Sequence, residues 1–114
     1  MSENTMLDSV LLDDYKASLG LDIVSEMLDL YVNQSALYLA DIKLAANSGD
    51  NQVWHDKCHK MKGAASSAGL VHVRAYLVEI EHSTAESSIK ADYYQELTRL
   101  NDEAVICFKA WLQE

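Results

Sequence analysis

The stretch DIVSEMLDLYVNQSALYLADIKLAA, residues 22–46, contains no proline or glycine and repeats apolar and small residues at alternating spacings of four and three. This spacing places them on one face of an α-helix. The stripe comprises Val24, Leu28, Tyr31, Ser35, Tyr38, Ile42 and Ala45. Asp22 suits the N-cap position. The stretch therefore predicts a long helix that packs one face against helical partners.

The remainder of the chain carries the same pattern between a few breaks. Helices are predicted over residues 7–19, 50–68 and 91–112, with another beginning after Gly69, and Gly20 ends the first of them. The stripes of the three later helices comprise Trp54, Cys58, Met61, Ala65, Ala68, Leu70, Val73, Leu77, Ile80, Tyr94, Leu97, Asn101, Ala104, Phe108 and Trp111. Four stripes with short connections predict an all-α fold, an up-down antiparallel four-helix bundle with a short additional N-terminal helix at one end.

The composition agrees with one helical domain. The chain has no proline and four glycines, and 49% of its residues are hydrophobic. A chain of this length buries roughly two-thirds of the surface that its unfolded form exposes, which is enough for one core. We therefore expect a single domain over residues 1–114, with an ordered core of about residues 7–113.

Charge and hydropathy exclude several classes of partner. The net charge of -9 argues against nucleic acid and against direct contact with an anionic membrane. Residues 1–5 are polar and no long apolar run follows, so neither a secretory signal nor a membrane-spanning helix is predicted. Cys58 and Cys107 have no CxxC spacing and suit reduced, packed thiols. The chain is expected to be cytoplasmic.

The stretch HDKCHKMKGAASSAG covers residues 55–69 and contains a second histidine, His59. His59 lies on the side of the predicted helix opposite its apolar stripe. At about 100° per residue, His55, Lys62, Gly63 and Ser66 lie within about 60° of His59. An outward imidazole is mostly neutral at pH 7, so one of its nitrogens can attack a phosphoryl group. The Lys62 ammonium can stabilise the transferred anion.

Gly63 interrupts this helix at a cost of roughly 1 kcal/mol relative to alanine. Two explanations are open. The missing side chain lets another protein's active site approach His59, or it lets a neighbouring helix pack tightly. Because Gly63 lies on the face of His59, we favour the first.

A metal site is the main competing interpretation of the histidines. His55 and His59 are four residues apart, as in an H-E-x-x-H helix, but Asp56 stands where that motif needs glutamate. No third protein ligand can be identified from the sequence. No metal site is therefore expected, and a helical adaptor with a metal-binding His55/His59 pair is kept as the alternative function. His72 and His82 are expected to be surface residues, since no partner arrangement can be recognised for either in the sequence.

The pattern H-x-x-K-G-x(5)-G, formed by His59, Lys62, Gly63 and Gly69, resembles the histidine-containing phosphotransfer (HPt) domains of bacterial two-component phosphorelays. The string HKMKGAASSAGL is most similar to the C-terminal HPt domains of tripartite hybrid sensor kinases, of the anaerobic-respiration and trimethylamine-N-oxide types. Weaker resemblance in LDDYKASLG and FKAWL extends it over nearly the whole chain. The family implies a four-helix bundle.

The resemblance also implies residue roles. His59 matches the histidine that accepts a phosphoryl group from a receiver-domain aspartate and passes it to a response regulator. Lys62 matches the lysine that stabilises the phosphoryl group, and Gly63 the small residue that admits the receiver. Glu81 takes the place of a residue that hydrogen-bonds the other imidazole nitrogen, which would fix the tautomer. A solvated surface glutamate is the alternative for Glu81.

The receiver is expected to contact the surface that rings His59. The candidate interface comprises His55, Lys60, Gly63, Ser66, Leu11 and Leu12. Lys60 would add positive charge from the flank of His59.

No nucleotide-binding motif is present, so we expect a phosphocarrier rather than an enzyme. We also expect the chain to be a monomer. It would need no cofactor of its own, because the family places Mg²⁺ in the partner receiver. Both a stand-alone carrier and the C-terminal domain of a membrane-anchored sensor kinase fit the sequence.

Overall fold

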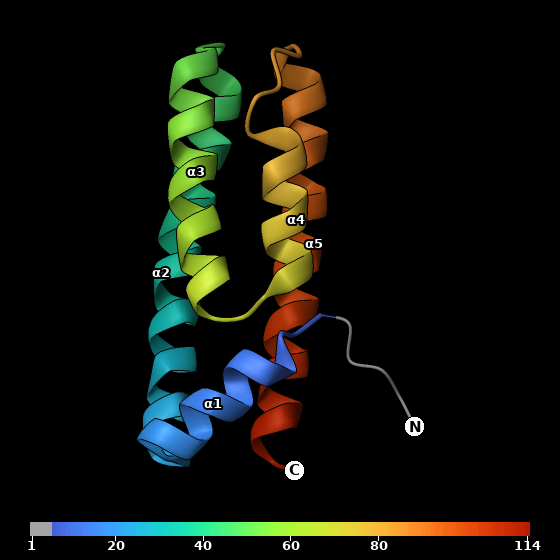
Figure 1. Cartoon of the computed structure of the whole chain (residues 1–114). Helices are drawn as coiled ribbons and strands as arrows, with labels where there is room; N and C mark the ends of the chain where they lie inside the picture. The colour runs from blue at the N-terminus through green and yellow to red at the C-terminus, as the bar shows by residue number, and fades with distance from the viewer. Residues whose placement is uncertain (1–5) are drawn as a thin grey trace.

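The computed structural model describes residues 6–114 and contains five helices. They are α1 (Ser9–Leu19), α2 (Leu21–Ser48), α3 (Asn51–Ser67), α4 (Val71–Ile80) and α5 (Ser87–Leu112). Helices α2 to α5 lie alongside one another, and α1 crosses one end of the bundle (Figure 1). The all-α bundle predicted from the stripes is confirmed. The polar residues 1–5, on which the absence of a secretory signal was argued, lie outside the described part of the chain.

The helix starts differ from their predicted positions by one to four residues, and two of these differences change the role of a residue. Helix α2 begins at Leu21 with Gly20 as its N-cap, because a φ of 89° at this glycine turns the chain directly out of α1. Asp22 therefore lies in the first turn instead of capping it. Helix α5 begins four residues before the predicted residue 91. Its extra turn includes Lys90, which is 1% exposed and donates a hydrogen bond to the side chain of Asn51.

The predicted stripes form most of the core, with one shift on α2. Tyr38 is only half-buried, and Leu39 takes the core position instead. A straight helix drifts by about 20° per heptad, so an inward stripe that passes Tyr31 and Ser35 turns away from residue 38. Tyr31 and Ser35 are buried, and their hydroxyls are linked through Asn101 of α5, which accepts from Tyr31 at 2.6 Å and donates to Ser35 at 3.2 Å. The polar positions in these stripes are therefore satisfied by one another.

Helix α1 fixes the turn between α3 and α4. Gly69 has a φ of 72°, and a Cβ there would lie 3.3 Å from the Leu12 side chain. The Asp8 N–H donates to the Gly69 carbonyl at 2.8 Å, and the Tyr15 hydroxyl donates to the Ser67 carbonyl at 3.0 Å. Leu12 is fully buried, so its predicted place in a receiver interface is wrong. Its side chain packs against Gly69, in the turn that follows α3.

Across residues 6–114, no helix combines the length and the apolar character needed to cross a membrane.

Candidate functional site

His59 lies on the outer face of α3, and its side chain is 63% exposed. The opposite face of the same helix is anchored in the core by Trp54, Cys58, Met61 and Ala65, each 0% exposed. The Trp54 indole N–H donates to the carbonyl of Ile80 at 2.7 Å, which ties α3 to the last turn of α4. The outward orientation expected of His59 is present, and it rests on a well-anchored helix.

Glu81 ends α4 and lies beside the imidazole. Its carboxylate Oε1 is 3.4 Å from Nδ1 of His59, although its side chain is only 4% exposed. The alternative that Glu81 is a solvated surface residue is therefore wrong. Because 3.4 Å is long for a charge-assisted hydrogen bond, the carboxylate is positioned next to Nδ1 without holding it tightly.

Lys62 makes the short contacts to this carboxylate. Its Nζ lies 2.8 Å from Oε2 and 3.1 Å from Oε1 of Glu81, and its side chain is 22% exposed. Burial by itself raises the pKa of Glu81, but the hydrogen bond and charge of Lys62, assisted by His59, leave that pKa below its ordinary value. Glu81 is therefore an anion at neutral pH and joins Lys62 and His59 into one cluster.

This arrangement gives the two imidazole nitrogens different environments. With a carboxylate at Nδ1, the neutral tautomer that carries its proton on Nδ1 is favoured. Nε2 then keeps its lone pair. The exposed His59 side chain can thus present a nucleophilic nitrogen to a partner, with the Lys62 ammonium one helical turn away.

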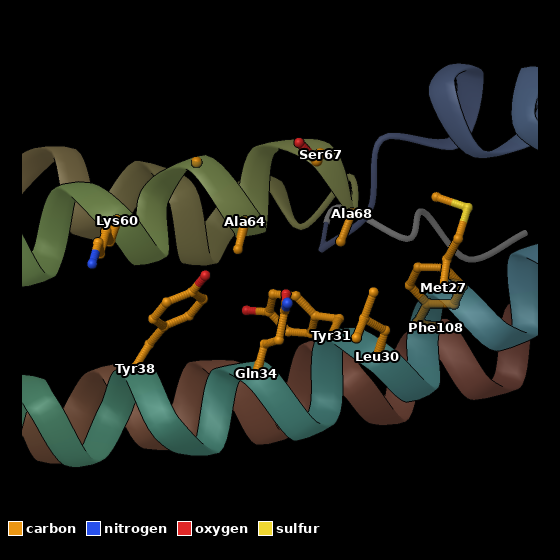
Figure 2. Close-up of a pocket in the computed structure, with 11 residues that line it drawn as sticks. Met27, Leu30, Tyr31, Gln34, Tyr38, Lys60, Ala64, Ser67, Ala68 and Phe108 are labelled. Carbon is orange, nitrogen blue, oxygen red and sulfur yellow. The ribbon is translucent and has the colours of Figure 1, made fainter.

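Gly63 has open space where a side chain would stand. A Cβ built there meets nothing within 4 Å. No neighbouring helix therefore packs tightly against Gly63, and that explanation for the glycine is rejected. Gly63 instead lines a groove of about 370 Å³ between α2 and α3. In Figure 2, Tyr38 and Gln34 of α2 reach toward Lys60 and Ala64 of α3 across this groove. The bare surface next to His59 therefore continues into a partly apolar hollow.

The remaining candidates do not form one surface. Ser66 is exposed and lines a separate hollow with Asp8 and Arg74, and Leu11 is half-buried on α1. His55 is half-buried, and its ring stacks on that of His59 with centroids 5.8 Å apart.

His82 belongs to the same cluster, which the sequence analysis missed. Its ring stacks on that of His55 at 4.6 Å, and its Nε2 lies 4.0 Å from Oε2 of Glu81. Its position directly after Glu81 was the available signal. His82 is a surface residue as expected, with its side chain 76% exposed, but the turn at the end of α4 brings it back toward α3 and gives it partners that the sequence did not show.

Comparisons with known proteins agree with this geometry. The model of the Hpt domain family matches residues 26–105, so the chain belongs to the Hpt domain family. Hpt domains are histidine phosphotransfer modules of two-component phosphorelays. A comparison with curated proteins gave no match.

Two solved structures share the fold. The histidine-containing phosphotransfer domain of ArcB from Escherichia coli has a TM-score of 0.82 and 22% identity, over 95% of this chain and 93% of that one. The histidine-containing phosphotransfer protein B (HptB) from Pseudomonas aeruginosa PAO1 has a TM-score of 0.82 and 24% identity, over 97% of both chains. The bundle is therefore the Hpt fold.

Proposed function

We propose that His59 accepts a phosphoryl group from the aspartyl phosphate of one receiver domain and passes it to the aspartate of another. The observation that carries this proposal is an exposed imidazole whose Nδ1 lies 3.4 Å from a buried carboxylate. In the forward step Nε2 forms a bond to phosphorus while the bond to the aspartate oxygen breaks. The receiver's carboxylate leaves with the electron pair, and the reverse step returns the phosphoryl group to a second aspartate.

Glu81 would stabilise the phosphorylated imidazole. Attack by Nε2 makes the ring cationic for as long as Nδ1 keeps its proton. A carboxylate 3.4 Å from Nδ1 can then form a charge-assisted hydrogen bond that is stronger than its contact with the neutral ring.

Lys62 would divide its ammonium between two anions. It is bound to Glu81 before transfer, and its Nζ is held on the side of α3 from which His59 projects. A phosphoryl group on His59 would give the lysine a second negative partner. Because the ammonium is already held nearby, it can stabilise the transferred group without a large movement of the Lys62 side chain.

The receiver would approach over the groove between α2 and α3. Gly63 and Lys60 belong both to this groove and to the neighbourhood of His59, so one docked surface can cover groove and imidazole together. Leu30 lines the groove and is 57% exposed, which offers an apolar contact at its edge. This replaces the interface through Leu12.

The protein would act as a phosphocarrier in the cytoplasm, as a monomer and without a cofactor for transfer. Mg²⁺ would be bound by the receiver. Assignment to a hybrid kinase of the anaerobic-respiration or trimethylamine-N-oxide type belongs to this proposal and rests on the motif string.

Phosphotransfer from a phosphorylated receiver to the wild type and to His59→Gln tests the proposal. The wild type should gain an acid-labile, base-stable phosphate, and the variant should gain none. Equal labelling of both chains would overturn it.

Replacing Leu30 tests the docking surface. Leu30→Asp should weaken transfer through a higher KM, whereas Ile106→Asp on α5, at a residue 66% exposed, should not. Equal effects of the two substitutions would remove the groove from the interface.

A further inference from the structure

Three histidines and one carboxylate converge where the middle of α3 meets the end of α4. We propose that His55, His59 and Glu81, with His82 as a fourth ligand, form a site for a transition-metal ion of the Zn²⁺ type, and that its occupation blocks phosphoryl transfer. The site goes beyond the proposed function, while its effect on transfer rests on that function.

The distances suit an ion after a small adjustment. One ligand atom from each of His55, His59 and Glu81 lies within 4.8 Å of the other two. Tetrahedral zinc with bonds of about 2.1 Å holds its ligand atoms about 3.4 Å apart. Rotation of the exposed His59 side chain can supply much of that contraction. Imidazole nitrogens with one carboxylate favour zinc-like ions over Mg²⁺, which prefers oxygen ligands.

The state of His55 points to a ligand independently of these distances. Its Nδ1 is buried and has no hydrogen-bond partner among the described residues. A buried polar atom of this kind requires an explanation. His55 also lines an open hollow of about 360 Å³ together with Glu81 and His82. An ion in this hollow would be reached from solvent and would lie beside the His55 ring, whose Nδ1 has no hydrogen-bond partner in the described part of the chain.

Lys62 opposes the ion. It holds both oxygens of Glu81, at 2.8 and 3.1 Å, and it would have to yield at least one of them to the metal. Its positive charge also disfavours a dication nearby. The site is therefore one in which lysine and metal compete for the same carboxylate, so removal of Lys62 should strengthen metal binding.

Coordination changes the chemistry of His59. A metal on Nδ1 uses the lone pair of that nitrogen, so the proton of the neutral ring moves to Nε2. Nε2 then carries an N–H and has no lone pair with which to attack phosphorus. The proton is conserved, and the nucleophile is removed without any covalent change.

Titration with Zn²⁺ by isothermal calorimetry tests the site directly. The wild type should bind one ion, and His55→Gln should bind at least about tenfold more weakly. His72→Gln is the matched control, because His72 lies at the opposite end of α4 from Glu81, and it should bind as the wild type does. Lys62→Met should bind more tightly. Equal affinity of the wild type and His55→Gln would overturn the site.

NMR of the wild-type chain tests the metal site without any substitution. The ring signals of His55, His59 and His82 should shift on addition of Zn²⁺ while those of His72 stay in place. A shift of His72 alone, or equal shifts of all four histidines, would contradict the assignment.

A transfer assay separates failure of this site from failure of the proposed function. Each rate is compared with the metal-free rate of the same chain, so that any effect of zinc on the receiver is shared. Zinc should inhibit the wild type more strongly than His55→Gln. Zinc binding to a chain that accepts no phosphate would sink the proposed function and leave the site standing. Normal transfer that zinc inhibits equally in both chains would sink the inference alone.

Discussion

Nζ of Lys62 lies 2.8 Å from Oε2 of Glu81, and this ion pair joins α3 to the end of α4 beside His59. The pair is mostly shielded from solvent, with the two side chains 22% and 4% exposed. Its geometry links transfer chemistry to stability, because the residue that would stabilise the phosphoryl group also neutralises a buried carboxylate.

Lys62→Met should therefore impair both properties. We expect transfer to slow by about 100-fold, as for the loss of one charge-stabilising donor. The unfolding free energy should fall by about 1–3 kcal/mol, because Glu81 loses its short hydrogen bonds in a buried position. Rapid-quench transfer and urea denaturation measure the two effects. The double variant Lys62→Met/Glu81→Gln should recover stability but not the transfer rate, because the buried charge is removed while the ammonium is still missing. Recovery of the transfer rate would contradict the role of Lys62 in stabilising the phosphoryl group.

Glu81→Gln should show a pH-dependent loss of stability. The folded pKa of Glu81 lies below its ordinary value, so the carboxylate contributes stability above the unfolded pKa of about 4.3. That contribution disappears as the pH falls through the lowered folded value. The difference in urea midpoint between wild type and variant should be largest near neutrality and shrink toward pH 3. A constant difference would mean that the charge of Glu81 is irrelevant.

Substitutions of Gly63 should separate folding from transfer. Gly63 lies within α3 and has free space around its missing Cβ, so Gly63→Ala should raise stability by about 1 kcal/mol. Gly63→Gln should fold but obstruct the receiver and slow transfer at least about tenfold. Thermal unfolding and transfer rates measure these outcomes. Wild-type transfer by Gly63→Gln would remove the steric role of this position.

Gly69→Ala should behave in the opposite way. A φ of 72° and a 3.3 Å approach to Leu12 make a side chain costly there, by about 1–2 kcal/mol from the backbone conformation alone. Urea denaturation should show this loss, while phosphorylation of the folded fraction should still occur on His59. An unchanged midpoint would show that the turn rearranges freely.

Cys58 should resist alkylation in the folded chain. Burial, reinforced by the charge of Glu81, raises the pKa of its thiol to about 12, so almost no thiolate exists at pH 8. Iodoacetamide should modify Cys107, which is half-buried, before Cys58. Mass spectrometry of peptides from the folded protein would show the order, and preferential labelling of Cys58 would contradict the burial of this α3 face.

Much of the fold follows from local pattern. The stripes predicted the helices to within a few residues, since helical periodicity and the left-handed backbone at Gly20 and Gly69 are properties of short segments. The start of α5 was misplaced because the burial of Lys90 depends on Asn51 and Trp54 of another helix. Leu12 was misplaced for the same reason, since its burial depends on the α3–α4 turn.

The sequence by itself determined that His59 faces away from the core with Lys62 and Gly63 near it, because residues three and four apart share one helical face. Only the tertiary structure decided that Glu81 is buried against Lys62 and that His82 stacks on His55. Those contacts join residues from 19 to 27 positions apart. Their distances depend on how α3 and α4 pack and on where the chain turns after Ile80, and helical periodicity specifies neither.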